Sequence, residues 1–276
     1  MYFAAFKINC LTLKQIIYCL YALLALVYGW GLSLPLMEND AAQHATMAMR
    51  MALENDWWHL YRGTTPYLDK PHLHFWLAAA AYKLLGFSHV VYRIPALLLT
   101  MLGAYSTYKL SGLYYDKKYS HPAALIFLST QAIILANHDV RTDAVLTGLV
   151  VFSVWKGATY LKTLQWPALI WTAIGMGLAF STKGQLGVFF IVVCLLTQLF
   201  YTKQWRALNP IKILMALVVF TITIMPVLYA FYVQFDQNPD LVVRGQNQIS
   251  GIRYILWEQS LGRLQGTDFA TANTGY

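Results

Sequence analysis

Long apolar segments constrain the fold of this chain more than any other feature of its sequence. A helix needs about 20 apolar residues to cross the hydrocarbon core of a bilayer. Seven segments approach that length: Ile16–Leu36, Ile94–Tyr114, Pro122–Ala136, Val145–Leu161, Ala168–Ser181, Leu186–Tyr201 and Ile213–Phe235. Only 12% of the residues are charged, whereas a soluble domain has about 25%. We therefore predict an all-α fold, a polytopic transmembrane helical bundle with about seven spans.

The positions of lysine and arginine predict the topology. A further apolar stretch, Leu73–Phe87, is short and carries Lys83. If this stretch does not cross, the basic residues of the short loops gather on the cytoplasmic side, as the positive-inside rule expects. We therefore predict a long outer loop at about 37–93 in which Leu73–Phe87 is an interfacial helix. The segment Ala41–Asn55 predicts a second helix in this loop, with Asp40 at the N-cap position.

The net charge of +8 gives no reason to expect a nucleic-acid partner, because Lys and Arg flank the apolar spans. Cys10, Cys19 and Cys194 lie before or within apolar segments and form no CxxC pair, so neither a disulfide framework nor a structural zinc site is expected. We predict a transmembrane core at 1–235 and an outer-side loop at 236–276. The expected location is the cell (inner) membrane, with membrane lipids as neighbours.

The predicted topology places a set of polar residues at the outer ends of the spans and in the long outer loop. Carboxylates beside hydrocarbon lose hydration, so they need a partner or a function. Cations at the same level can bind a phosphate, and a carboxylate there can deprotonate an attacking hydroxyl group. This arrangement suits the transfer of a group from a lipid phosphate. The candidate residues are Asp40, Tyr67, Asp69, Lys70, Arg141, Asp143 and Lys183.

Most of these residues also have a purely structural explanation. Asp40 could serve only as a helix cap, and Lys70 could be an ordinary turn cation. Arg141 and Asp143 could pair with each other across a loop. Lys183 precedes a glycine, and both residue types are typical of a helix C-terminus. No single residue decides between the two explanations.

Four segments in order resemble a known family. They read YLDKPHLHFWL, YRIPAL, DVRTDAVLT and STKGQLG, and an acidic site follows the first predicted span. Together they resemble the GT-C glycosyltransferases, in the branch of the lipid A aminoarabinose transferase and the dolichyl-phosphate-mannose–protein mannosyltransferases. The resemblance covers roughly Pro35 to Gly187, and the tail RYILWEQSLGRLQG is similar to the family's outer loop after the seventh span.

The resemblance implies catalytic roles for two carboxylates. Asp40 matches the first-loop acid, which is the candidate base that activates the acceptor. Asp143 matches the second acid of the family, with Arg141 as its basic companion. Lys70 matches the lysine that is expected to hold the donor phosphate, and Tyr67 is its neighbour in the same motif.

The resemblance also implies the ligands. Lys183 is expected near the donor head group, and Asp69 matches an acid that sits near a divalent metal ion in some members. No other cofactor is expected. The donor would be a sugar on a polyprenyl phosphate, and the acceptor a lipid of the lipid A type or a protein hydroxyl. The reaction would invert the anomeric centre, on the periplasmic face of the membrane.

The sequence departs from the family pattern in three respects. The family often has Asp-Glu-x-Arg after the first span, where this chain has Asp40-Ala41-Ala42-Gln43. His72 replaces the second proline of the lysine motif. Family members are usually nearly twice as long, so we expect the outer-side loop at 236–276 to be truncated. One alternative is therefore a catalytically incomplete fragment or a lipid-binding membrane protein. A transporter is less favoured, because the ionisable residues lie at span ends and no half-repeat is visible.

Overall fold

The computed structural model describes residues 12–243 and 245–262, and this part of the chain is almost entirely helical. Within it, five helices are long and apolar enough to cross a membrane, and a bent pair would make a sixth span. The five are α1 (Leu13–Ser33), α4 (His89–Tyr114), α7 (Thr142–Thr163), α9 (Gln185–Thr202) and α10 (Pro210–Phe231), which a π-helical turn prolongs to Asp236. The pair is α5 (Ser120–Ser129) and α6 (Gln131–His138), bent by 52°. The polytopic helical bundle is confirmed.

The remaining predicted span, Ala168–Ser181, corresponds to α8 (Trp166–Lys183), which is 18 residues long but does not reach the hydropathy that marks the five helices as membrane-capable. α8 packs against both α7 and α10. A Cβ atom on Gly175 would lie 2.2 Å from Ser153 Oγ, and one on Gly177 would lie 2.6 Å from Thr223 Cβ. Small residues therefore let α8 approach its neighbours closely, as in other membrane bundles. A helix that faces protein on two sides needs less apolar surface, and the count of seven spans stays a prediction.

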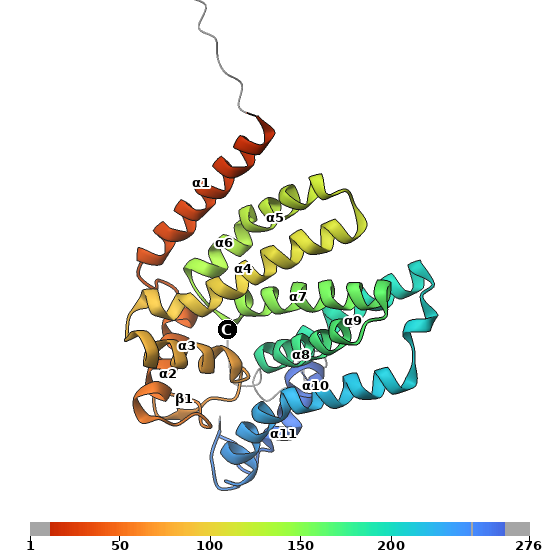
Figure 1. Ribbon diagram of the computed structural model, residues 1–276. Coiled ribbons are helices and arrows are strands. Elements are labelled where there is room, and N and C mark those ends of the chain that lie inside the picture. The colour runs from red at the N-terminus through yellow and green to blue at the C-terminus, as the bar shows by residue number, and fades with distance from the viewer. Residues whose placement is uncertain (1–11, 244, 263–276) are drawn as a thin grey trace, which may run out of the picture.

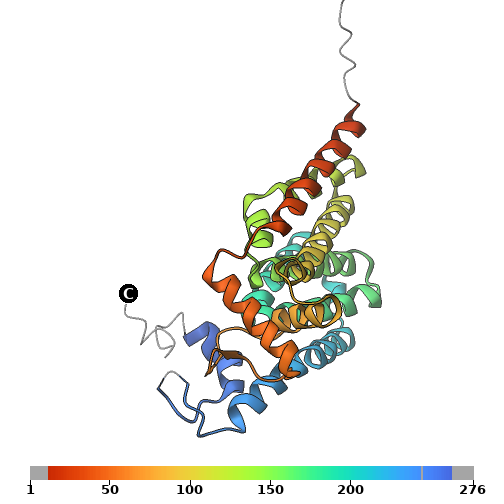
Figure 2. The same cartoon turned by 90° about the vertical axis from the view of Figure 1, so that its left-hand side faces the viewer.

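Two further helices and a hairpin gather at one end of the bundle, opposite the connection between α9 and α10 (Figure 1). They are α2 (Asn39–Glu54), the hairpin of β1 (Tyr61–Arg62) and β2 (Thr65–Pro66), and α3 (Leu73–Leu85). Figure 2 views this end directly. The predicted helix at Leu73–Phe87 is confirmed. Its 13 residues span about 20 Å, which is less than the hydrocarbon thickness of about 30 Å, so α3 cannot cross a membrane alone.

An apolar core joins these outer helices to the bundle. Met47 and Met51 of α2 and Phe75 of α3 are fully buried and belong to one cluster with Tyr92 of α4 and Val140, which precedes α7. Burying side chains of this size stabilises a structure by about 1.5–3 kcal/mol each. The outer helices are therefore a packed part of the fold, and they hold the polar residues that they carry in fixed positions.

The start of α2 differs from the prediction. The helix begins at Asn39 with Glu38 as its N-cap, so Asp40 lies in the first turn and does not cap the helix. The chain before the helix is fixed by Asp139, whose Oδ1 accepts hydrogen bonds from the backbone N–H groups of Met37 (3.2 Å) and Glu38 (3.4 Å). This contact comes from a distant segment, so local sequence could not reveal it. The carboxylate of Asp40 is still favoured, because it lies at the positive end of the helix dipole.

The segment after α10 folds back onto the bundle. It contains α11 (Gly251–Arg253) and a π-helical turn at Tyr254–Gly262. Asp236 accepts hydrogen bonds from Ser250 Oγ (2.5 Å) and from the backbone N–H of Ile252 (3.1 Å). Tyr254 and Ile255 are fully buried in a second apolar cluster. Residues 263–276 of the predicted outer-side loop lie outside the described residues, and the boundary at 235 stays a prediction.

Candidate active site

Arg141 lies between two acidic side chains of the α2 segment. It is the N-cap residue of α7, and its Nη1 atom is 3.5 Å from Glu38 Oε2 and 3.9 Å from Asp40 Oδ2. All three side chains are about half exposed, so these ion pairs are accessible to a ligand. The alternative that Arg141 pairs with Asp143 is wrong, since each of them pairs with another residue. Glu38 was not among the predicted site residues, although it lies two positions before Asp40.

Lys183 and Asp143 form the second ion pair of the site, with 2.6 Å between Nζ and Oδ1. Asp143 lies in the first turn of α7 and Lys183 in the last turn of α8. Each charge therefore complements the dipole of its own helix. The structure brings together two residues 40 positions apart that sequence analysis had assigned to one site.

Gly184 ends α8, as the sequence suggested, and its backbone conformation and surroundings disfavour any residue with a side chain at this position. Its φ is +64°, and a Cβ atom there would lie 2.3 Å from Gln259 Oε1. Gln259 is 6% exposed and donates a hydrogen bond from Nε2 to the carbonyl oxygen of Asp69 (2.9 Å). The tail after α10 is thus held between the Lys183-Gly184 corner and the loop that carries Asp69 and Lys70.

The loop between the hairpin and α3 supplies the remaining predicted residues. Lys70 is partly buried, and its ammonium group acts electrostatically on both His44 and Asp143. Tyr67 is buried, and its hydroxyl group is 3.3 Å from His44 Nε2. Burial raises the pKa of Tyr67, and the nearby charges of Asp69 and Asp40 raise it further, so this hydroxyl stays neutral. The seven predicted residues therefore belong to one end of the bundle.

His44 lies at the centre of these groups, and sequence analysis missed it. It is four residues after Asp40, so both side chains share one face of α2. Burial lowers its pKa to about 4; Asp40 and Asp143 raise the pKa, whereas Lys70 and Arg141 lower it. His44 is therefore neutral at pH 7. Its Nδ1 atom is buried without a hydrogen-bond partner among the described residues. The spacing from Asp40 was the signal that could have identified it.

A second buried histidine, His74, takes part in a hydrogen-bond chain that holds the backbone just before Arg141. Tyr92 OH donates a hydrogen bond to the carbonyl oxygen of Val140 (2.8 Å), and it lies 2.9 Å from His74 Nε2. Since a carbonyl oxygen only accepts, the tyrosine proton points to Val140, and we assign the proton of His74 to Nε2. The chain of bonds from α3 through α4 ends at the residue before Arg141. Burial, together with the neighbouring His44, lowers the pKa of His74 to about 3.

Arg93, from the YRIPAL segment, joins the two loops that carry the first ion pair. Its side chain is 1% exposed. It donates to the carbonyl oxygens of Leu34 (2.6 Å) and Pro35 (3.2 Å), which precede α2, and to that of His138 (2.8 Å), which precedes α7. Arg93 therefore acts as a structural clamp that sets how Glu38 and Asp40 lie relative to Arg141.

The structure shows no set of metal ligands around Asp69 among the described residues. Across residues 12–243 and 245–262, no group of three or more His, Cys, Asp or Glu side chains could hold a metal ion. Its backbone carbonyl group serves as the anchor for Gln259. We derive no step of the reaction through a metal ion. Metal binding at Asp69 stays a prediction from the resemblance.

Comparison with known proteins gives consistent results. Residues 69–229 match the family model described as dolichyl-phosphate-mannose-protein mannosyltransferase. The undecaprenyl phosphate-alpha-4-amino-4-deoxy-L-arabinose arabinosyl transferase 2 of Proteus mirabilis is 23% identical over 177 residues, which are 62% of this chain and 32% of that protein. The corresponding transferase of Wigglesworthia glossinidia brevipalpis is 25% identical over 177 residues, 61% of this chain and 31% of that protein. The chain thus spans about a third of the length of the curated relatives that it matches.

Solved structures share the fold. The apo crystal structure of ArnT from Cupriavidus metallidurans aligns with a TM-score of 0.72 and 20% identity, over 83% of this chain and 43% of that one. The structure of the same protein bound to undecaprenyl phosphate aligns with a TM-score of 0.72 and 18% identity, over 90% of this chain and 45% of that one.

Proposed function

Because the chain belongs to the dolichyl-phosphate-mannose-protein mannosyltransferase family, we propose that it is a membrane glycosyltransferase that uses a polyprenyl-phosphate-linked sugar. The observation that carries this proposal is the convergence of Lys70, Arg141 and Lys183 with the carboxylates of Asp40 and Asp143 at one end of the bundle. Transfer from a lipid phosphate needs cations for the phosphate and a carboxylate for the acceptor in one place.

The proposed donor site consists of the three cations. The phosphate of the donor binds at Lys183, and Lys70 and Arg141, which like Lys183 act electrostatically on Asp143, add positive charge near it. These cations come from three different segments, so folding is required to assemble them. Preorganised cations stabilise a leaving phosphate without reorganisation during the reaction. The relatives named for undecaprenyl phosphate derivatives support a polyprenyl donor. Tyr67 stays a predicted donor-binding residue, and its hydroxyl group contacts His44.

The proposed transfer step uses Asp40 as the base. Its carboxylate accepts the proton of the acceptor hydroxyl group, whose oxygen forms a bond to the anomeric carbon of the sugar. The bond between that carbon and the phosphate oxygen breaks, the polyprenyl phosphate leaves with its electron pair, and attack from the opposite face inverts the centre. Asp40 is farther from Arg141 than Glu38 is, and its side chain is 63% exposed, which supports an accessible carboxylate. The contact of Asp143 with Lys183 supports a positioning role for the second acid.

The proposed acceptor is a hydroxyl group of a lipid, on the periplasmic face of the inner membrane. The resemblance to the lipid A aminoarabinose transferase favours this acceptor, whereas the family name favours a protein hydroxyl. A second candidate function, lipid binding without transfer, follows from one observation. The chain covers only about a third of those relatives, and the rest of their length could carry groups that transfer needs.

Two measurements test the proposal on the purified full chain. The first is binding of undecaprenyl phosphate, measured by native mass spectrometry, for Lys183→Gln and Arg141→Gln. Loss of a charged hydrogen bond should weaken binding about tenfold or more. Lys14→Gln, on the exposed start of α1, is the matched control and should bind normally. Unchanged binding in both site variants would contradict the donor site.

The second measurement is sugar transfer in proteoliposomes from labelled undecaprenyl-phosphate-linked aminoarabinose to a lipid extract. Asp40→Asn should abolish transfer while undecaprenyl phosphate still binds. Full transfer by this variant would exclude Asp40 as the base. Binding without transfer in the unmodified chain would instead favour the lipid-binding alternative.

A further inference from the structure

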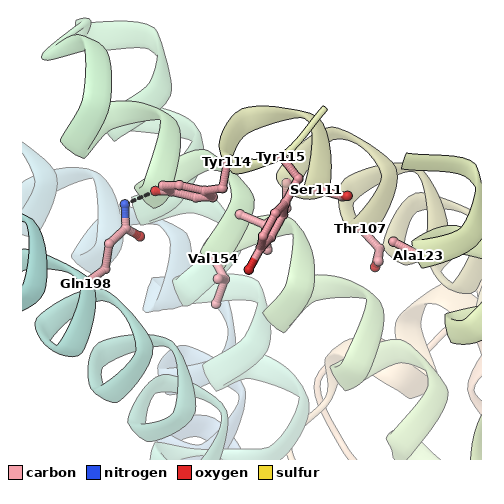
Figure 3. Close-up of a pocket in the computed structure, with 8 residues that line it drawn as sticks. Thr107, Ser111, Tyr114, Tyr115, Ala123, Val154 and Gln198 are labelled. Atoms are coloured by element: carbon pink, nitrogen blue, oxygen red, sulfur yellow. Dashed lines mark hydrogen bonds between the residues drawn. The ribbon is translucent and has the colours of Figure 1, made fainter. Parts of the chain in front are cut away.

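A groove with an apolar part and a more polar part lies at the opposite end of the bundle from the candidate active site. It opens between the end of α4, α5, α7 and α9 and has a volume of about 420 Å³ (Figure 3). The side chains of Tyr115, Val154 and Ala123 line this part, which is almost wholly apolar. Gln198 of α9 donates a hydrogen bond to Tyr114 OH at its edge. The lining helices α4, α7 and α9 are long and apolar enough to cross a membrane, so we expect this groove to face lipid.

A cavity of about 260 Å³ with a more polar lining continues the groove. It shares Tyr114 and Gln198 with the apolar part and is lined further by Lys162 and Gln204. Lys162 is exposed and donates one hydrogen bond to the carbonyl oxygen of Leu113 (2.6 Å). An ammonium group has three N–H donors, so two remain for a ligand. An apolar arm thus ends beside a cation and two amide side chains.

We propose that this groove binds one anionic phospholipid. An acyl chain lies in the apolar arm beside Tyr115 and Val154, and the headgroup phosphate contacts Lys162. Charge complementarity supports this occupant, because basic pockets between transmembrane helices bind anionic headgroups on the cytoplasmic side. Tyrosine rings are enriched at the headgroup level, where Tyr114 and Tyr115 would lie. The predicted topology places this end on the cytoplasmic side, so the site is distinct from the proposed donor site and does not depend on it.

The test compares two lipids by native mass spectrometry of the purified chain, phosphatidylglycerol and zwitterionic phosphatidylcholine. Phosphatidylglycerol should bind more tightly. Lys162→Gln should weaken its binding about fivefold, which is the contribution of one lysine near a charged membrane surface. Lys14→Gln removes a charge on the same predicted side but outside the groove, and it should have no effect. Equal binding of both lipids, or an equal loss in both variants, would overturn the proposal.

A second pair of variants tests the apolar arm. Val154→Trp fills it from α7, and Ala123→Leu narrows it from α5. Either variant should reduce phosphatidylglycerol binding while undecaprenyl phosphate binding at the other end is retained. If Val154→Trp does not fold, Ala123→Leu, which is the smaller change, provides the test. Normal phosphatidylglycerol binding in a folded variant would show that the acyl chain does not occupy the arm.

Discussion

Replacement of Arg93 by methionine should destabilise the fold and loosen the candidate active site together. Among the described residues Arg93 makes four hydrogen bonds to backbone carbonyl oxygens, those of Leu32, Leu34, Pro35 and His138. Several of these belong to the last turn of α1 and the residues after it, where carbonyl groups lack helical partners. Each bond contributes about 1 kcal/mol net, so Arg93→Met should lower the free energy of unfolding by about 4 kcal/mol.

Arg93→Lys separates the charge from the geometry. Lysine keeps the positive charge, but all of its N–H donors are on one nitrogen atom. The guanidinium group of arginine has its donors on three nitrogen atoms. One ammonium group cannot reach both the segment before α2 and the carbonyl oxygen of His138 in the same way. We expect this variant to lose about half of the stabilisation, or about 2 kcal/mol.

Thermal unfolding of the purified chain in detergent measures the effect. The loss predicted for Arg93→Met corresponds to a fall of about 8 °C in the midpoint, at about 2 °C per kcal/mol for a chain of this size. Lys118→Met is the control, since its exposed pair with Asp116 contributes less than about 1 kcal/mol. Undecaprenyl phosphate binding should also weaken in Arg93→Met, because Glu38 and Arg141 lie on the two loops that Arg93 joins. Equal midpoints for the two methionine variants would refute the clamp.

Two other predictions concern pH and the tail. Burial lowers the pKa of His44 to about 4 and that of His74 to about 3, from 6.5 in the unfolded chain. Their contribution to stability is therefore complete above pH 6.5 and is lost as the pH falls toward 4 for His44 and toward 3 for His74. At pH 5 each buried histidine should lower the free energy of unfolding by roughly 2 kcal/mol relative to neutral pH. Thermal unfolding midpoints measured from pH 7.5 to 5 should therefore fall less steeply in His74→Phe than in the unmodified chain. Parallel pH dependence of the two midpoints would contradict this. Gly184→Ala strains a position with φ +64° and pushes Gln259 away, so hydrogen exchange in residues 251–259 should rise and the free energy of unfolding should fall by about 1–3 kcal/mol. Unchanged exchange in that segment would show that Gly184 does not hold the tail.

The sequence predicted the residues of the site better than their partners. Asp143 and Lys183 could be identified because each stands at a helix end inside a recognisable local pattern. Their pairing could not, since the contact depends on how α7 and α8 pack. The same applies to Arg141, which sequence analysis considered beside Asp143, two residues away, and which instead meets side chains about 100 positions earlier.

The helices themselves were largely predictable, because apolar length and charge are local properties. The start of α2 was not, because a carboxylate from a distant loop, Asp139, binds the backbone before it. Arg93 illustrates a different limit. Its place in the YRIPAL segment gave it no predicted role, and its nearly complete burial and its carbonyl partners give it a structural one. His44 was missed because its spacing of four residues from Asp40 is only a weak signal, and its other neighbours, Tyr67, Lys70 and Asp143, come from distant segments.

The pair of Lys183 and Asp143 has a consequence for turnover. In the proposed reaction the same ammonium group serves the carboxylate in the empty site and the phosphate in the loaded one. The two anions therefore compete for this ammonium group, and whatever strengthens the pair weakens the phosphate complex. After transfer the polyprenyl phosphate product still carries its phosphate, and Asp143 supplies an internal ligand that replaces it. The carboxylate would thus limit product inhibition, and an Asp143→Asn enzyme would retain its spent carrier.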